Sequence, residues 1–211
     1  MRVDSDYRAR AWERFTINGE RALSDQKYDI AGVAFESAID QARQGGLDDM
    51  HLAQSLSNLG WTRMKGGQLQ KAVQIFAECS KVCDRLDANH TVNGPALDLV
   101  RARMETGLGE CARGSMKQDE AIAHYRKALG IFKNGSFPAD CGYGAIGEIA
   151  TIAYSGLGDS LIACNKPSDA LDAFRSAAEV SDITPGRLVL KDAARDKYVR
   201  MLKTFQSAPH R

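Results

Sequence analysis

The residue types that most often carry catalysis are scattered in this sequence. Its four histidines, His51, His90, His124 and His210, stand far apart, and none belongs to a His-Glu-x-x-His motif. The phosphate-binding pattern Gly-x4-Gly-Lys-Ser/Thr and the hydrolase pattern Gly-x-Ser-x-Gly do not occur either. The sequence therefore predicts a protein that is not an enzyme and that uses no cofactor.

Two cysteines are placed where they could act together. Cys79 and Cys83 are four residues apart, on one face of a helix, and a thiolate pair can bind a metal or take part in redox chemistry. A metal site would need further ligands nearby, and the sequence supplies none. We therefore expect no metal, and we interpret both cysteines as small buried packing residues. His124 precedes an aromatic of the repeat described below, and we expect it at the rim of a groove rather than in a ligand set.

The elements that must position these residues come from an internal repeat. Four segments share the pattern Ala-x3-aromatic-x2-small, and a glycine stands twelve residues before each alanine. Spacings of four and three residues place the alanine, the aromatic and the small residue on one helical face. Each unit is predicted to be two antiparallel helices that cross where the glycine and alanine bring the backbones together. The four sets are Gly19, Ala31, Phe35; Gly60, Ala72, Phe76; Gly109, Ala121, Tyr125; and Gly158, Ala170, Phe174.

A Gly-Leu-Gly sequence occurs twice, at 107–109 and 156–158. Glycine pairs of this kind can cradle a phosphate when a strand precedes them and a helix follows. Here no strand is predicted before either pair, and the second glycine of each is a repeat glycine. We therefore expect both pairs to lie inside helices, at the points where two helices cross.

These units resemble the tetratricopeptide repeat (TPR) family, whose pattern is Trp-x2-Leu-Gly-x2-Tyr followed by Gly-x-Tyr-x2-Ala-x3-Phe-x2-Ala. The segments 26–31 and 67–72 carry the middle of that pattern. The leading Trp is replaced by Phe15, Leu56, Glu105 and Tyr154, and the closing Pro of the family is missing in every repeat. The resemblance implies an all-α, right-handed α-solenoid built from stacked helix pairs.

The repeats are longer than the usual period of about 34 residues. Successive repeat alanines are 41, 49 and 49 residues apart, and the extra length lies between repeats. This geometry is similar to the extended repeats of kinesin light chains, cell-polarity adaptors and bacterial peptide-sensing regulators. We expect a single domain over 1–211, with repeats at about 6–46, 47–88, 94–134 and 142–181 and a capping helix at 187–206.

In such a solenoid the first helix of each pair lines the concave surface. Spacing around each repeat glycine predicts a stripe of mostly polar residues there, although any one of them could simply be solvated. Trp61 differs, because a large aromatic on a wet stripe packs either on a ligand or between neighbouring helices. We expect Trp61→Ala and Arg103→Ala to weaken capture of a partner while leaving the melting temperature nearly unchanged. The predicted groove residues are Glu20, Gln54, Ser57, Asn58, Trp61, Lys65, Arg103, Thr106, Glu110, Arg113 and Asp159.

The resemblance also indicates which partner does not fit. TPR proteins that hold the acidic C-terminal tails of chaperones use Lys and Asn in one repeat, Asn in the next, and Lys and Arg in a third. The matching positions here are Thr16, Glu20, Asn58, Arg103 and Gly107, of which only Asn58 is identical. Because Glu20 would repel a carboxylate, we do not expect a chaperone tail as partner. Mixed charges along the stripe favour a ligand with both acidic and basic groups, or a polar amphipathic helix.

Composition narrows the classes of partner and of cellular location that this protein can have. Lys and Arg number 28, Asp and Glu number 27, and the net charge is +1, so nucleic acid is not an expected partner. No apolar run approaches a membrane span, so no membrane insertion is expected. Five scattered cysteines without a secretory signal predict a cytoplasmic protein. The leading hypothesis is an adaptor that binds a peptide or helix of a protein partner. A self-associating scaffold, and hence a homo-oligomer, and a peptide-sensing regulatory receptor are the alternatives.

Overall fold

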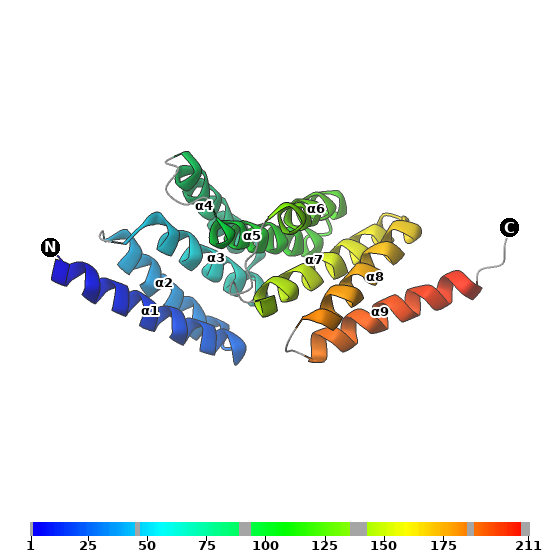
Figure 1. Cartoon of the computed structure of the whole chain (residues 1–211), viewed down its shortest axis with the longest axis horizontal. Helices are drawn as coiled ribbons and strands as arrows, with labels where there is room; N and C mark the ends of the chain where they lie inside the picture. The colour runs from blue at the N-terminus through cyan, green and yellow to red at the C-terminus, as the bar shows by residue number, and fades with distance from the viewer. Residues whose placement is uncertain (1, 45–46, 89–93, 136–142, 185–187, 208–211) are drawn as a thin grey trace.

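The chain folds into helices that follow one another along a bent array. The computed structural model describes residues 2–44, 47–88, 94–135, 143–184 and 188–207, and every regular element within these ranges is an α-helix (Figure 1). The N- and C-termini lie at opposite ends of the array. The helices are α1 (Arg2–Ser24), α2 (Tyr28–Arg43), α3 (Asp49–Lys65), α4 (Leu69–Ala88), α5 (Pro95–Gly114), α6 (Gln118–Asn134), α7 (Tyr143–Ala163), α8 (Pro167–Ile183) and α9 (Leu188–Ser207).

The helices pack as sequential pairs, as the repeat predicts. Each odd-numbered helix from α1 to α7 packs on the even-numbered helix that follows it, and α9 packs on α8 and α7. Contacts that skip one helix join α3 to α5, α5 to α7 and α7 to α9. Trp12 Nε1 on α1 donates to Ser55 Oγ on α3 at 2.8 Å, so the odd-numbered helices follow one another in one layer. The predicted fold class, an α-solenoid of four pairs and a capping helix, is confirmed.

The repeat aromatics fill the crossing points between pairs. Phe35, Phe76 and Tyr125 have no exposed surface. A Cβ atom added at Gly60 would lie 2.5 Å from the Phe76 ring, and one added at Gly107 would also collide with that ring. Phe76 is therefore clamped between a glycine of its own pair and a glycine of the next pair. This arrangement explains the Gly-Leu-Gly sequences as packing surfaces inside helices and confirms that interpretation.

The turn inside each pair contains one residue in the left-handed region. Its φ is +59° at Gln26, +77° at Gly67, +61° at Met116 and +57° at Asn165. In each turn the residue that follows donates its N–H to a carbonyl five residues earlier, for example Lys117 N to Ala112 O at 2.9 Å. This bond closes the C-terminus of the first helix, and the left-handed residue makes it possible. Only one of the four turns uses glycine, which adopts this conformation without strain.

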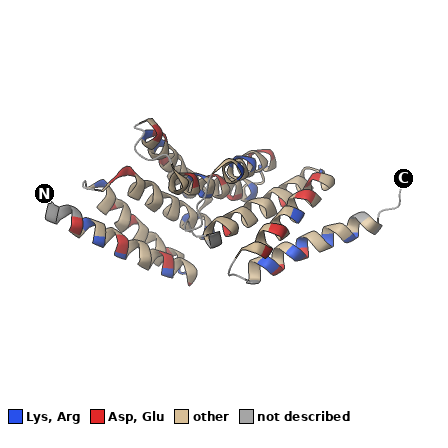
Figure 2. Ribbon diagram, in the orientation of Figure 1, with Lys and Arg blue, Asp and Glu red and all other residues tan. Residues whose placement is uncertain are grey.

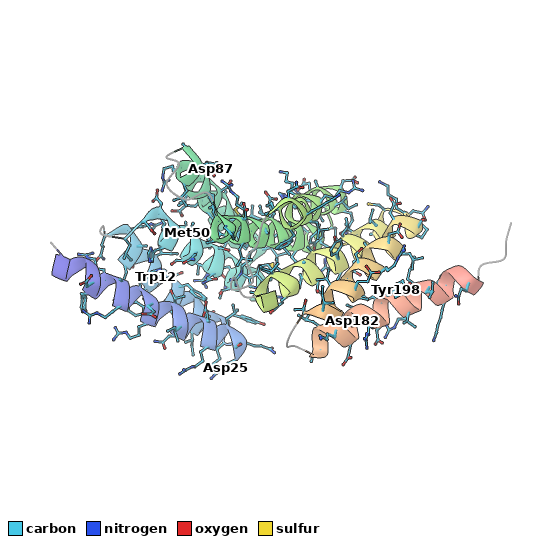
Figure 3. The ribbon with its side chains drawn as sticks, in the orientation of Figure 1. Trp12, Asp25, Met50, Asp87, Asp182 and Tyr198 are labelled. Carbon is cyan, nitrogen blue, oxygen red and sulfur yellow. The ribbon has the colours of Figure 1, made fainter. Side chains whose placement is uncertain are left out.

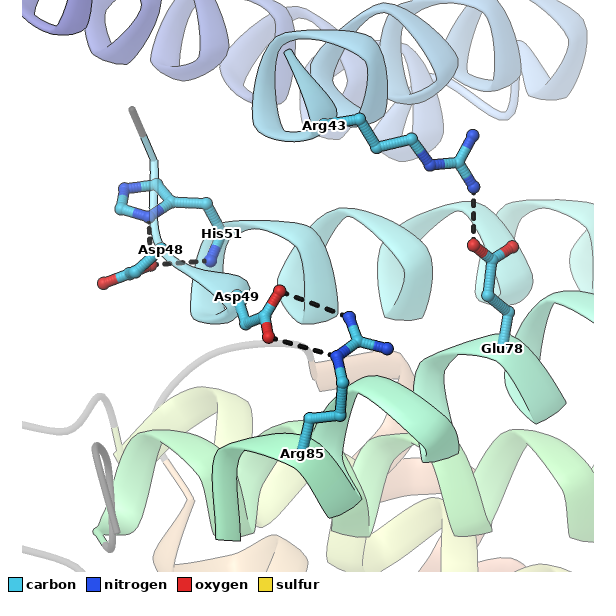
Figure 4. Close-up of polar contacts among 6 residues, drawn as sticks. All are labelled: Arg43, Asp48, Asp49, His51, Glu78 and Arg85. Atoms are coloured by element: carbon cyan, nitrogen blue, oxygen red, sulfur yellow. Dashed lines mark hydrogen bonds and ion pairs between the residues drawn. The ribbon is translucent and has the colours of Figure 1, made fainter. Parts of the chain in front are cut away.

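Polar contacts lie on the surface within the second pair and between the first pair and the second. Asp48 caps α3, because its Oδ1 accepts from His51 N at 3.1 Å and from His51 Nδ1 at 2.5 Å (Figure 4). Burial opposes ionisation of Asp48, but these hydrogen bonds outweigh it and lower the pKa of that carboxyl. Arg85 on α4 forms a two-bond pair with Asp49, the first residue of α3. Arg43 Nη2 on α2 lies 2.5 Å from Glu78 Oε1 on α4. Exposed pairs such as these contribute little to stability.

Candidate functional site

Arg103 on α5 lies at the centre of the layer of odd-numbered helices. Its Nη1 donates to Asn58 Oδ1 on α3 at 2.6 Å, and its Cζ lies 5.4 Å from the centroid of the Trp61 ring. Lys65 Nζ lies 5.5 Å from the same centroid. Two cations therefore share one indole, an arrangement that stabilises both charges and limits how the guanidinium can turn. The structure thus brings together four of the predicted groove residues.

The side chains around Arg103 are more deeply buried than their polar character suggested. Trp61 is 7% exposed, Asn58 6%, Ser57 2% and Thr106 0%. Of the two alternatives that the sequence left open for Trp61, the structure shows packing between helices, since Trp61 belongs to the core that spans the first three pairs. Trp61→Ala would therefore remove buried surface and cost about 3–5 kcal/mol of stability. The expectation that this variant melts like the wild type is wrong.

Carboxylates on two other helices act on Arg103 through their charge. Burial lowers the pKa of Arg103, whereas the charges of Glu20 on α1 and Glu148 on α7 raise it. Even with this loss of solvation the guanidinium stays protonated at neutral pH. Glu148 was not among the predicted groove residues. It lies in the long N-terminal part of α7, and the early start of that helix near Tyr143 was the signal that could have pointed to it.

Two of the predicted acidic residues are neutralised within the chain. Arg113 Nη2 lies 2.8 Å from Glu110 Oε2, and the Tyr125 hydroxyl donates to Glu110 Oε1 at 2.6 Å. Lys197 Nζ on α9 donates to Asp159 Oδ2 at 2.7 Å. Sequence reasoning missed both Tyr125 and Lys197 as partners, because each pairing depends on how successive helices stack. Glu110 and Asp159 consequently offer less charge to a ligand than the sequence suggested.

Further polar groups surround the central residues. Gln54 is half-buried on α3, and Glu20 and Lys65 are exposed. The hydroxyls of Thr16 on α1 and Ser57 on α3 are buried and have no hydrogen-bond partner among the described residues. The two occupy the same place in successive repeats, three residues before the repeat glycine. Buried hydroxyls of this kind can bind a water molecule or a polar ligand atom.

His124 and Glu105 explain one departure from the repeat pattern. His124 Nδ1 lies 2.7 Å from Glu105 Oε2, and both side chains are largely buried. Glu105 stands where the TPR pattern has its leading Trp, so here a polar contact between α5 and α6 replaces an aromatic one. His124 therefore contacts Glu105 within the chain. This contact explains the position of His124 without a role at the rim of a groove.

The cysteines are free thiols where the structure describes them. Cys79, Cys83 and Cys111 are buried and Cys164 is half-buried; Cys141 lies outside the described residues. Cys79 Sγ donates a weak hydrogen bond to Ala53 O on α3 at 3.4 Å, and the thiol is buried among packed helices. Within the described ranges no group of three or more His, Cys, Asp or Glu side chains could hold a metal ion. None of the helices in those ranges has the length and apolarity that crossing a membrane requires.

Four helix pairs, a capping helix and a polar layer of first helices define a TPR-like α-solenoid. Among solved structures, the fold is similar to that of BtubC (BKLC) from P. vanneervenii. The TM-score is 0.62 at 15% sequence identity, and the match covers 94% of this chain and 84% of BtubC. At this identity the likeness concerns the fold. No protein-family model matches the sequence, and no curated protein matches it.

Proposed function

We propose that this protein is a non-catalytic adaptor that binds a peptide or helix of a protein partner on the layer of odd-numbered helices. TPR-like folds generally serve as protein-interaction modules, which supports the proposal. The observation that carries it is the guanidinium of Arg103, held in place by Asn58 and Trp61 at the centre of that layer. The proposal treats the chain as one domain with repeats at about 6–46, 47–88, 94–134 and 142–181 and a cap at 187–206. Its free thiols suit the cytoplasm.

The geometry around Arg103 sets the kind of ligand. A guanidinium has five N–H donors in a planar fork, and one of its nitrogens is held by Asn58. Because the fork is already oriented, a ligand carbonyl or carboxylate can bind it at a small entropic cost. Lys65 and Glu20 are exposed beside it and carry opposite charges. The ligand we expect therefore combines an acceptor for Arg103 with a basic group for Glu20, and a purely acidic tail fits less well.

A selection from a display library of random peptides tests this proposal. Trp12→Phe leaves Trp61 as the only tryptophan, so a bound peptide that contacts the Arg103–Trp61 stack should change its fluorescence. We expect Arg103→Lys to weaken selected peptides at least ~10-fold, because lysine keeps the charge but loses the fork. Lys71→Ala, an exposed cation on α4, is the matched control and should leave the affinity unchanged. Equal affinity for the wild type and Arg103→Lys, with both folded, would move the binding site away from this layer.

A further inference from the structure

A cavity of about 610 Å³ lies between α6 and α8, over one face of α7 (Figure 1). Small-molecule sites in proteins typically enclose ~300–1,000 Å³ and have mainly apolar walls with a few polar groups. This cavity fits that description, because all three helices contribute apolar side chains to it and one of them, Ile183, is 84% exposed at the end of α8. The apolar lining consists of Leu129, Phe132, Ile146, Tyr154, Val180 and Ile183.

An equivalent cavity lies one repeat earlier, between α4 and α6, and its lining is much more polar. Its volume is about 540 Å³. The repeat alanines Ala72 and Ala121 are 49 residues apart, and the same shift carries lining positions of the earlier cavity onto lining positions of the later one. Three charged residues of α5 are replaced in α7 by two small residues and one aromatic. The pairs are Asp98 and Gly147, Arg101 and Ala150, and Glu105 and Tyr154.

The apolar character of the later cavity is therefore not imposed by the repeat. The earlier cavity shows that the same positions accept charged side chains in this fold. On the wall formed by the even-numbered helix, Ser80 of α4 corresponds to Leu129 of α6, so this replacement also removes a polar group. Glycine and alanine in place of longer side chains leave the space open. The result is a hollow apolar surface from which an apolar ligand would displace water.

Two cations line the α6 side of this cavity. Arg126 and Lys133 are exposed and lie seven residues apart, on one face of α6, whose Lys and Arg positions are blue in Figure 2. Neither has a hydrogen bond or ion pair with another of the residues that the structure describes. None of the described residues that line the cavity is acidic. On α8, Asp182 Oδ1 lies 2.9 Å from Arg195 Nη2, on the side that meets α9 (Figure 3). The cavity therefore offers two cations to an anionic group.

The cavity is too short for a partner helix. Its α6 wall extends over seven residues from Arg126 to Lys133, which is ~10 Å of helix. A specific protein interface buries ~800 Å² on each partner, more than two helical turns of wall supply. Thr184 lies against Gly147 and joins the α7 and α8 walls, whereas a Cβ atom added at Gly130, midway along the α6 wall, would meet nothing within 4 Å. The space suits a small ligand with a slender apolar body.

We propose that this cavity binds a small anionic amphiphile, of which a medium-chain fatty acid is the simplest example. Its aliphatic chain lies along Ala150 between the α6 and α8 walls, where it displaces water from apolar surface. Its carboxylate lies at the edge of the cavity, where Arg126 or Lys133 donates a charge-assisted hydrogen bond. None of these residues is part of the site around Arg103, so this ligand is distinct from the partner of the proposed adaptor.

Isothermal titration calorimetry with decanoate, at low salt and below the concentration at which it forms micelles, tests this proposal. We expect one molecule to bind per chain. Butyrate has the same carboxylate on a much shorter chain, and decyltrimethylammonium has a similar chain with the opposite charge, so both should bind at least ~10-fold more weakly. Arg126→Glu/Lys133→Asp reverses both cations, and Lys133→Asp introduces the residue type that the earlier cavity has at Asp84. This variant should bind decyltrimethylammonium more tightly than decanoate.

The control is Lys71→Glu/Lys81→Glu, which makes the same change in net charge at exposed positions of α4 and should bind decanoate like the wild type. A folded wild-type chain that does not bind decanoate would overturn the proposal, and so would equal affinity for decanoate and butyrate. Several molecules bound per chain would indicate non-specific adsorption, which also contradicts it. If Arg126→Glu/Lys133→Asp is folded and binds decanoate like the wild type, the site lies elsewhere and the proposal is wrong. The peptide selection described above tests the site around Arg103 separately, so either proposal can fail alone.

Discussion

Gly156 on α7 is a position where one added methyl group should destabilise the protein. A Cβ atom there would lie 2.5 Å from the Tyr125 hydroxyl and 2.9 Å from Glu110 Oε1, and it would also collide with the Tyr125 ring. Tyr125 is fully buried and cannot move without displacing its neighbours. Gly156→Ala must therefore disturb the hydrogen bond from Tyr125 to Glu110.

Three effects combine in Gly156→Ala. Alanine favours the helix over glycine by about 1 kcal/mol. Overpacking at the crossing point costs about 1–3 kcal/mol, and weakening a buried hydrogen bond to a charged acceptor costs about 1.5–3 kcal/mol. We expect a net destabilisation of about 1.5–5 kcal/mol. For a chain of this length that lowers the melting temperature by roughly 3–20 °C.

Gly130 on α6 provides the matched control. It also lies inside a helix, but a Cβ atom there would have nothing within 4 Å. Gly130→Ala should therefore show only the gain in helix propensity, about 0.5–1 kcal/mol, and melt roughly 1–4 °C higher. Thermal unfolding followed by far-UV circular dichroism measures both variants. If Gly156→Ala melts like the wild type, or if both variants shift in the same direction, the clamp on Tyr125 is not what holds these pairs together.

Three further predictions concern the turns, the cap and alkaline pH. Gly67→Ala should lower the free energy of unfolding by about 1 kcal/mol, because φ there is +77°, although an added Cβ would meet nothing within 4 Å. Met116→Gly should not lower the melting temperature, and a large decrease would argue against backbone strain in that turn. Deletion of the chain from Thr184 onward removes the contact of Lys197 with Asp159 and uncovers Phe174. Limited proteolysis of the shortened chain should therefore cut α7 and α8 faster than α1 to α4. Equal resistance of all these helices would show that α9 does not stabilise the last pair. Burial, aided by the charge of Glu110, raises the pKa of Cys111 from 9.0 to about 11, so between these pH values the folded chain keeps a proton that the unfolded chain loses. The free energy of unfolding, measured with denaturant, should therefore be constant below pH 9 and decline toward pH 11. The decline should be less steep in Cys111→Ala, and equal slopes in the two chains would refute the prediction.

The repeat architecture could be predicted from the sequence because its constraints are local. Wherever two helices cross, one position needs a small residue such as Gly60, and the facing position needs a large one such as Phe76. The groove stripe could be predicted only as a set of positions. Which of these residues are exposed depends on the rotation between successive pairs, and no residue spacing encodes that rotation.

Several features of the site therefore could not be predicted from residue spacing in the sequence. Trp61 on α3 is buried in the core of the first three pairs, where Arg103 of α5, 42 positions along the chain, lies over its ring. The Lys197–Asp159 contact joins residues 38 positions apart, across the connection between α8 and α9. Glu105 pairs with His124 at a position where the TPR pattern predicts an aromatic contact. In each case the partner is set by tertiary packing rather than by the sequence around it.

The proposed binding site for a protein partner is the layer of odd-numbered helices around Arg103. A selected peptide that carries a photoreactive side chain, cross-linked to the wild-type chain and mapped by mass spectrometry, tests it most directly. We expect cross-links on the inner side of α1, α3 and α5, near Glu20, Lys65 and Arg103, that disappear when unlabelled peptide competes. Competed cross-links confined to α2, α4, α6 and α8, or to the outer faces of α1 and α9, would contradict it.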